Sequence, residues 1–563
     1  MLLMQEVAAM FQKRSAPYDQ GLPQEQRLRA NIADLFLTNA LPAQRIQQMF
    51  NDSHAAGARN FGDLKRAADD GGKNDSRNIR RKLLKRTPWP PLYYSPVRLW
   101  DPKAQREVVQ HLPFLLPHEM LYTLALHNSP QALLQQTAMS NGTKARLLEA
   151  QASLGVQGLV GLGLWGDGVP ANWDRTESYE VVSMMLPGIA NFRVPITSVS
   201  KKFWITRTTS DDIMETIKWS LECALTGQFP QQRHDQTPWS PSDSWRKKRQ
   251  GQSLGARGVL CEVRADWSWL ASTLRLPAWN AKAGNCFICK CTREEAKDVS
   301  LSASWRQRPL SHWELLQKWA ETGVGVCPLW QAPGVSLKIV TLDWLHIADL
   351  GVASVFQGNL WYYILNKIAP GESRKSQCSK LFLQLQEFYR ANADVTSRYD
   401  TLVPTMLKQP KSQPRLRGKG AEIRGVVAFS YALACKYLED SDPKEHTMKQ
   451  AARLLLEVYN NLSHDRFNAD NMKTQGRQFM ALCAALEKAS AGTLYWQLKP
   501  KHHLFLHLCE SGSNPVDTWT YRDEDFGGAM AALARRRGGK NSPRASAERM
   551  LRLFCGKHEV PLF

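Results

Sequence analysis

The stretch LGVQGLVGLGLWGD at residues 154–167 constrains the fold most, because it is apolar almost throughout and ends on a carboxylate. Such a run predicts a strand buried on both faces, which needs other elements packed on either side. Further strands are predicted at 178–188 and 192–205, with turn signals between them. Asp167 then has two interpretations, an Asp-Gly turn or a metal-binding carboxylate carried at a strand end.

A helix and a fourth strand are predicted after these three strands. The helix spans 211–227, with Asp211 as its N-cap and Gly227 just past its end. After a polar, basic loop, the fourth strand ends at Asp266, which gives Asp167 a counterpart at a second strand end. Three antiparallel strands, a helix and a further strand open many α/β nuclease-like folds. The predicted fold class is therefore α/β.

The remaining chain is predicted to be mostly helical. A good amphipathic pattern covers 22–40, a flexible linker is expected over 51–86, the proline-rich segment 87–96 is extended, and a helical region runs from 112 to about 151. The expected division is an N-terminal helical and flexible basic region (1–86), a helical region before the core (87–153), the first part of the core (154–275), a cysteine-containing insertion (276–335), an Asp-x-x-His segment with a helical insertion (336–515), and C-terminal helices (516–563).

The charge balance points to a polyanionic partner. The 563 residues carry a net charge of +21, spread over several clusters, which favours nucleic acid over a membrane surface. One cluster, RNIRRKLLKR (77–86), is either a solvated helix face, a nuclear-import signal or a phosphate-contacting arm. The candidate nucleic-acid-binding residues are Arg77, Arg80, Arg81, Lys82, Lys85, Arg86, Lys247 and Lys248.

Cysteine usage and hydropathy indicate the compartment. The 11 cysteines are scattered and odd in number, which is typical of a reducing, intracellular environment rather than of a secreted disulfide framework. The N-terminus lacks the layout of a signal peptide, and no apolar stretch reaches the length of a membrane span. We expect a soluble protein that does not bind membranes.

The segment NCFICKCTREE (285–295) offers a specific metal-binding pattern. Cys286 and Cys289 can place two thiolates on one Zn²⁺, and a structural zinc site needs four ligands. The sequence does not choose the other two ligands. The candidates are Cys291, His312, Cys327 and His346, and the alternative is a set of free buried thiols.

Two later segments carry histidines. In TLDWLHIADLG (341–351), Asp343 and His346 lie three residues apart near a strand-to-helix junction, where they either bind metal, hold a site in shape or pack in the core. In KPKHHLFLHL (499–508), His503 and His507 share a helix face, but the glutamate of a metalloprotease motif is missing. We interpret this second segment as a packed helix with a basic, phosphate-facing start.

Three acids, Asp523, Glu524 and Asp525, open a C-terminal helix. The helix macrodipole alone favours acids at this position. Together with Asp167 and Asp266, however, one of them can complete a two-metal site, in which two divalent ions stabilise the attacking and leaving oxygens of a phosphoryl displacement.

Taken in order, the motifs WGDGVP…ESYEVVSMMLP, VLCEVRADWSWL, CFIC, LDWLHIADLG, KPKHHLFLHL and WTYRDEDFGG resemble the transposase of CACTA-type cut-and-paste DNA transposons. The similarity is closest to divergent copies in protist genomes and covers roughly residues 87–530. The resemblance implies an RNase H-like catalytic core interrupted by a large, mainly helical insertion. It also implies metal-dependent cleavage and strand transfer of transposon-end DNA in the nucleus, with homo-oligomerisation as an open expectation.

The resemblance assigns roles by position. Asp167 matches the first catalytic acid, Asp266 the second and Glu524 the third, and these three would hold Mg²⁺ or Mn²⁺. Asp343 and His346 match an Asp-x-x-His pair, and Cys286 and Cys289 match a cysteine segment for structural Zn²⁺. Gly166 and Gly168 are expected to let the backbone turn tightly beside Asp167.

The sequence departs from the family pattern in three places. The second pair of zinc ligands is unclear, Asp343 is an alternative to Asp266 as the second acid, and the third acid can shift to Asp523 or Asp525. No N-terminal zinc finger is evident, and the chain stops soon after the last helix. The alternative function is therefore a degenerate or domesticated nucleic-acid-binding protein without catalysis.

Overall fold

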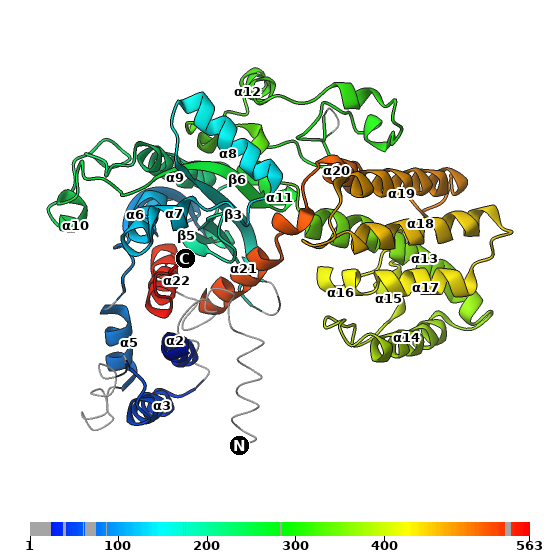
Figure 1. Cartoon of the computed structure of the whole chain (residues 1–563), viewed down its shortest axis with the longest axis horizontal. Helices are drawn as coiled ribbons and strands as arrows, with labels where there is room; N and C mark the ends of the chain where they lie inside the picture. The colour runs from blue at the N-terminus through cyan, green and yellow to red at the C-terminus, as the bar shows by residue number, and fades with distance from the viewer. Residues whose placement is uncertain are drawn as a thin grey trace.

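The computed structural model describes residues 24–37, 41–59, 61, 75–85, 87–172, 174, 176–281, 284–534 and 542–563. The fold is mixed α/β. In Figure 1 the strands and their covering helices lie on one side and a purely helical part lies on the other, with α20 and α21 between the two parts.

The main sheet has four strands in the order β5-β4-β3-β6. Strands β3 (Leu159–Pro170), β4 (Ser178–Met185) and β5 (Arg193–Ser200) are antiparallel neighbours, and β6 (Arg257–Ala265) pairs parallel to β3. One further parallel bridge joins Val263 to Val340 beyond β6. Because Gly166 is paired with Ala265, the next residues, Asp167 and Asp266, come side by side at one edge of the sheet.

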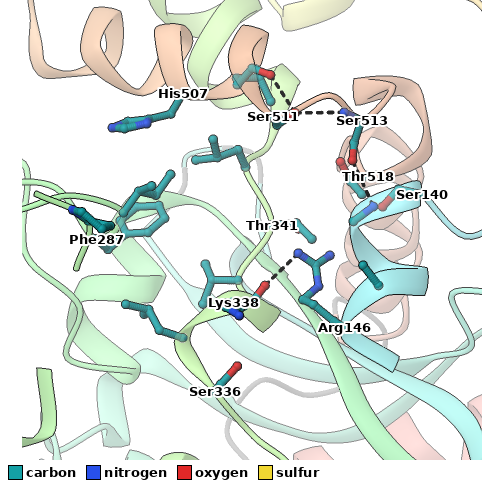
Figure 2. A pocket seen from close by; sticks show the side chains of 18 of the residues that line it. Ser140, Arg146, Phe287, Ser336, Lys338, Thr341, His507, Ser511, Ser513 and Thr518 are labelled. Atoms are coloured by element: carbon teal, nitrogen blue, oxygen red, sulfur yellow. Dashed lines mark hydrogen bonds between the residues drawn. The ribbon is translucent and has the colours of Figure 1, made fainter. Parts of the chain in front are cut away.

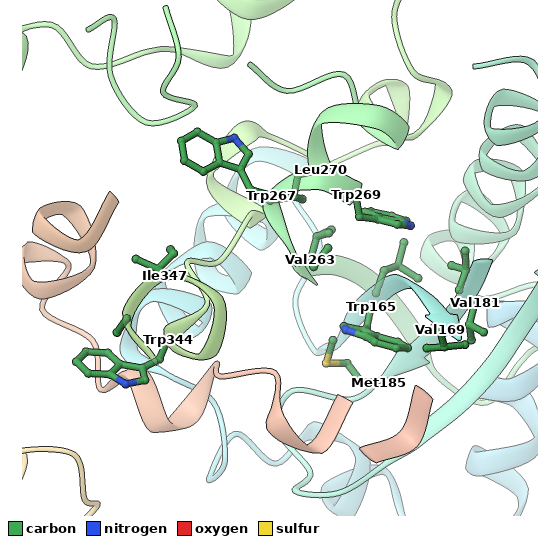
Figure 3. Close-up of a cluster of buried hydrophobic side chains, with 14 of the residues drawn as sticks. Trp165, Val169, Val181, Met185, Val263, Trp267, Trp269, Leu270, Trp344 and Ile347 are labelled. Atoms are coloured by element: carbon green, nitrogen blue, oxygen red, sulfur yellow. The ribbon is translucent and has the colours of Figure 1, made fainter. Parts of the chain in front are cut away.

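Side chains of β3 alternate between the two faces of the sheet, as the period of a strand requires. Trp165 and Val169 point to the face covered by α21 (Tyr521–Ala534), where a Cβ on Gly527 would touch both side chains. On the opposite face, a Cβ on Gly166 would overlap the indole of Trp269. Figure 3 shows Trp165 and Val169 together and Trp269 apart from them. Asp167 therefore shares the face of α21.

A two-stranded hairpin, β1 (Tyr93–Asp101) and β2 (Arg106–Phe114), precedes the sheet, and helices connect and cover the strands. Helix α9 (Thr208–Thr226) packs on β6 and on the hairpin, and α22 (Pro543–Lys557) packs on β5. The other helices of this half are α2 (Gln24–Leu37), α3 (Ala43–Ala55), α5 (Asp75–Lys85), α6 (Pro117–His127), α7 (Pro130–Leu134), α8 (Asn141–Leu154), α10 (Ser244–Lys247), α11 (Trp267–Thr273) and α12 (His312–Glu321).

The helical part begins with a π-helical turn, η7 (Leu345–Ala353), which continues directly into α13 (Ser354–Ile368). A π-helix is rare and is often found at functional sites. The following helices are α14 (Arg374–Ala391), α15 (Pro404–Leu407), α16 (Gly420–Gly425), α17 (Val427–Tyr437), α18 (Pro443–Asn460), α19 (Ala469–Ala489) and α20 (Pro500–Glu510). No helix in the described part of the chain has the length and apolar character to cross a bilayer.

Several local predictions differ from the structure. Strand β3 continues three residues past Asp167, so this residue is not in a turn. Helix α9 starts at Thr208 after Arg207, whose φ of 70° already turns the chain, and Asp211 lies inside the helix; Gly227 does end it, in the left-handed region. Residues 112–114 belong to β2 because they pair with β1, and the expected linker 51–86 contains helix α5.

A buried histidine near the hairpin predicts how stability depends on pH. His118 is fully buried, and burial together with the charge of Arg246 lowers its pKa to about 3. The unfolded chain, with a histidine pKa of about 6.5, binds more protons below that pH, so this contribution to stability is complete above about pH 6.5 and is lost as the pH falls toward 3. We expect this group to lower the free energy of unfolding by about 2 kcal/mol between pH 7 and pH 5.

Melting curves at both pH values test this expectation. His118→Gln should flatten the dependence on pH, whereas His127→Gln, at an exposed position of the same helix, should leave it unchanged. Equal dependence in His118→Gln and in the wild type would contradict the assignment.

Candidate functional site

Three carboxylates from separate elements lie near one another where β3 and β6 end, and we call them the acidic centre: Asp167 on β3, Asp266 after β6 and Glu524 on α21. Burial, and then the charge of Asp266, raises the pKa of Asp167 to about 6. Burial, and then the charge of Asp167, raises the pKa of Glu524 to about 8. The carboxylates are thus close enough to oppose one another's ionisation, which is the arrangement that a bound cation relieves.

Asp343 and His346 form a pair beside the acidic centre. His346 Nδ1 donates a hydrogen bond to Asp343 Oδ2 (2.5 Å), and His346 Nε2 lies 3.9 Å from Glu524 Oε1. Although burial opposes the charged form, the hydrogen bond and charge of Asp343 raise the pKa of His346 to about 9. His346 is therefore a cation at neutral pH, held against the acidic centre by a carboxylate that is itself only 3% exposed.

Contacts of the first residues of α21 set the rotation of this helix, and the rotation decides which of the acids 523–525 faces the site. Asp523 is fully buried and accepts a hydrogen bond from Arg193 Nε (2.5 Å), so it points into the core. Asp525 is exposed. Glu524 lies between these two orientations and faces Asp167 and His346.

A second set of contacts joins α21 to the π-helical turn η7. Asp349, fully buried in η7, accepts hydrogen bonds from Tyr521 Oη (2.6 Å) and Tyr459 Oη (2.5 Å). Thr520 N, just before α21, donates to Asp343 Oδ1 (2.9 Å). The element that carries His346 and the element that carries Glu524 are thus held together by buried polar contacts.

The glycines around Asp167 have a different role from the predicted one. Neither adopts a positive φ among the described glycines, so neither provides a tight turn. Gly166 leaves room for the indole of Trp269, and Gly168 leaves room for the side chain of Lys201. The structural reason for both glycines is close packing against the strand that carries Asp167.

Four possible metal ligands lie together between the loop 285–291 and α20, and we call them the Cys/His cluster: Cys286, Cys289, His503 and His507. Their ligand atoms all lie within 4.8 Å of one another, and His503 Nε2 lies 3.2 Å from Cys289 Sγ and 3.1 Å from His507 Nε2. A tetrahedral zinc site with ordinary bond lengths separates its ligand atoms by about 3.3 to 3.8 Å. The cluster can therefore hold a metal such as zinc.

The predicted partners of Cys286 and Cys289 need correction. His346 lies at the acidic centre, His312 packs on Trp330, and Cys327 is buried and does not belong to the cluster. Cys291 does lie beside the cluster, with its Sγ 3.3 Å from His503 Nε2. His503 and His507 take the two open positions because α20 presents them on one face, i and i+4.

The predicted basic residues are described only in part. On α5, Arg77 is exposed and Lys82 is half-buried, whereas the side chains of Arg80, Arg81 and Lys85, and all of Arg86, lie outside the described residues. Lys247 closes α10 and Lys248 follows it, and both are exposed. In Figure 1, α10 lies at the far end of the molecule from the helical part.

Sequence reasoning missed two charged residues near the acidic centre. Glu180 on β4 forms an ion pair with Lys201 (2.8 Å), and the charges of Asp167 and Asp266 act on Lys201. The alternating pattern of β4 places Glu180 on one face of the sheet. Nothing in the sequence indicates that Lys201, which follows β5, lies beside Glu180.

A cavity of about 880 Å³ is lined in part by the segment 336–342. It opens between α8, this segment and the end of α20, and Figure 2 shows Arg146, Phe287 and His507 around it. Its lining includes His507 of the Cys/His cluster but no residue of the acidic centre. The acidic centre therefore lies outside this cavity.

No family model matches the sequence, and a comparison with curated proteins gives no match.

Proposed function

We propose that the chain is a metal-dependent enzyme of the DNA transposase type, which cleaves and transfers phosphodiester bonds of DNA. The observation that carries this proposal is that Asp167, Asp266 and Glu524 lie near enough for their charges to raise the pKa of Asp167 and of Glu524, with His346 Nε2 3.9 Å from Glu524 Oε1. Carboxylates with this mutual repulsion are suited to Mg²⁺ or Mn²⁺, which prefer oxygen ligands.

The strand arrangement supports an RNase H-like core. Three antiparallel strands, a crossover helix and a parallel fourth strand give the order β5-β4-β3-β6. Val340 pairs in parallel with Val263 of β6, at the place where a fifth strand of the sheet would lie. The three carboxylates would then lie on the first strand of the core, after its fourth strand and on a C-terminal helix, the positions that the resemblance implies for the catalytic acids. The helices α13–α19 then form the insertion between the second and third acids.

In this proposal each residue has a distinct task. Asp167, Asp266 and Glu524 would hold the divalent ions, whose chemistry is to stabilise the attacking and leaving oxygens of an in-line displacement. Asp266 is kept in place because its Oδ1 caps α11 through Trp269 N (2.6 Å). Asp343 is surrounded by donors and orients His346, so we propose Asp266, not Asp343, as the second metal ligand.

We further propose that the Cys/His cluster holds Zn²⁺ as a structural ion. Two thiolates and two imidazoles are a common ligand set for structural zinc. His503 Nδ1 is buried and has no hydrogen-bond partner among the described residues, so its Nε2 is the only polar atom of the ring that contacts neighbours. A metal there would join the loop 285–291 to α20.

A direct test incubates the full chain with labelled duplex DNA and Mn²⁺. The proposal expects DNA binding followed by strand cleavage or joining of strands. Binding without either reaction, over a range of substrates that includes short inverted repeats, would favour the nucleic-acid-binding protein without catalysis.

The buried contact between η7 and α21 gives a separate prediction. Tyr521→Phe removes one hydrogen bond to Asp349, which loosens the helix that carries Glu524. We expect kcat for cleavage to fall about tenfold while KM for DNA stays unchanged, because small misplacements of reacting groups are costly.

The matched control is Tyr459→Phe, which removes the other hydroxyl from Asp349 but lies on α18, away from α21. Both variants should lose similar stability, about 1 kcal/mol. Equal kcat in the two variants would show that Tyr521 has only a structural role.

A further inference from the structure

Residues 408–419, which we call the basic loop, carry positive charge beside η7, the element that also carries His346. The loop connects α15 to α16, and its sequence KQPKSQPRLRGK holds no acid. Within the part of the chain that the structure describes, none of its basic side chains takes part in an ion pair, whereas other cations of the helical part do, such as Lys367 with Glu445 and Lys449 with Asp440. The loop is therefore a surface of unpaired charge.

The basic loop is held in one conformation by the helix beneath it. Leu416 is buried and its N donates to Ser354 O (2.7 Å), while Arg415 and Arg417 on either side are exposed. A Cβ on Gly358 would overlap the backbone of Arg415 and Leu416, so the loop lies directly on α13. Beyond Leu416, Arg417 and Lys419 are both exposed and lie two residues apart.

The loop also touches the element that carries His346. Arg415 donates hydrogen bonds to Leu350 O (2.6 Å) and Ser354 Oγ (3.1 Å) at the end of η7. From the neighbouring helix α20, Lys501 Nζ donates to His346 O (2.7 Å). Two basic side chains, Arg415 from the basic loop and Lys501 from α20, thus bond to the backbone of η7.

We propose that the basic loop is a docking surface for the phosphate backbone of duplex DNA that flanks the bond at the acidic centre. This inference rests on the proposed function, because the nearby acidic centre is what favours DNA over other anionic partners. Exposed cations without an ion-pair partner, on a segment anchored to α13 through Leu416, suit a chain of phosphates, and each such contact adds affinity that depends on salt.

The test measures binding of a 30-base-pair duplex by the full chain without divalent ions, over a range of NaCl concentrations. The variant Lys411→Gln/Arg417→Gln/Lys419→Gln should bind at least about tenfold more weakly, with a salt slope lower by up to about 3, because up to three phosphate contacts are lost. Arg415 is left in place because it contacts η7.

The matched control, Lys375→Gln/Lys473→Gln/Lys488→Gln, removes the same charge from exposed positions elsewhere on the helical part. Its affinity and salt slope should stay near those of the wild type, and the melting temperatures of both variants should be unchanged. An equal loss of affinity in both variants would overturn the docking surface. Weakened binding to an acidic peptide or to anionic vesicles, with duplex binding intact, would overturn it in favour of those partners.

Two outcomes separate this inference from the proposed function. A wild type that cleaves DNA, with a loop variant that binds normally, overturns the docking surface alone. A loop variant with weakened binding supports the docking surface even when the wild type shows no cleavage with Mn²⁺, which contradicts the catalytic proposal alone.

Discussion

Asp167→Asn and Glu524→Gln are each expected to lower the rate of Mn²⁺-dependent DNA cleavage by at least about a hundredfold, because each removes one charge that would hold a divalent ion at the reacting phosphate. The substitutions keep the size of the side chain, so folding should be preserved. Without metal at pH 7, DNA affinity should stay equal or rise slightly for Asp167→Asn, which removes a negative charge facing the phosphates. It should stay equal for Glu524→Gln, because the raised pKa of about 8 leaves the Glu524 carboxyl mostly neutral.

The matched control for Glu524→Gln is Asp525→Asn, which removes an exposed carboxylate from the next position of the same helix. It should cleave DNA at the wild-type rate. If Asp525→Asn inactivates the protein and Glu524→Gln does not, the orientation of α21 described above does not represent the active protein.

Asp266→Asn and Asp343→Asn separate the two assignments of the second acid. We expect both to abolish cleavage, for different reasons: Asp266 is a proposed metal ligand, and Asp343 holds His346 as a cation. A loss of activity in Asp343→Asn with full activity in Asp266→Asn would make Asp343 the second metal ligand.

The sequence was sufficient to predict the strands that position the acidic centre. The run before Asp167 is apolar on both faces, and Asp266 directly follows β6, another buried strand, so two acids at neighbouring strand ends could be predicted from local patterns. The resemblance assigned Glu524 but left Asp523 and Asp525 as alternatives, and only tertiary contacts separate them: Asp523 points inward because it pairs with Arg193 and Arg264.

Other features depend on contacts that no local pattern records. The glycines beside Asp167 are explained by Trp269 and Lys201, which come from other elements. The hairpin β1–β2 was partly missed because half of its second strand is polar and exposed. Cys289 and His503 are 214 residues apart, so the spacing of the cysteines could not identify the second pair of ligands.

The second large effect is expected from the Cys/His cluster. Metal analysis should find about one Zn per chain. Removal of the ion by a chelator should lower the melting temperature by at least about 5 °C, because the ion binds the folded chain, where the four ligands are together, and so stabilises it over the unfolded chain. Cys286→Ser and His507→Ala should lose the ion. Cys291→Ser and His312→Ala should retain it, since Cys291 lies beside the four ligands and His312 lies apart from them.

Loss of zinc should also lower the activity of the acidic centre, although none of the four ligands belongs to that centre. Helix α20 carries both His503 and Lys501, and Lys501 holds the backbone of His346. A helix released from the loop 285–291 would let this contact shift, so cleavage should fall together with the melting temperature and recover when Zn²⁺ is restored. A preparation free of zinc that melts and cleaves like the wild type would show that the four side chains are packed thiols and imidazoles without a structural ion.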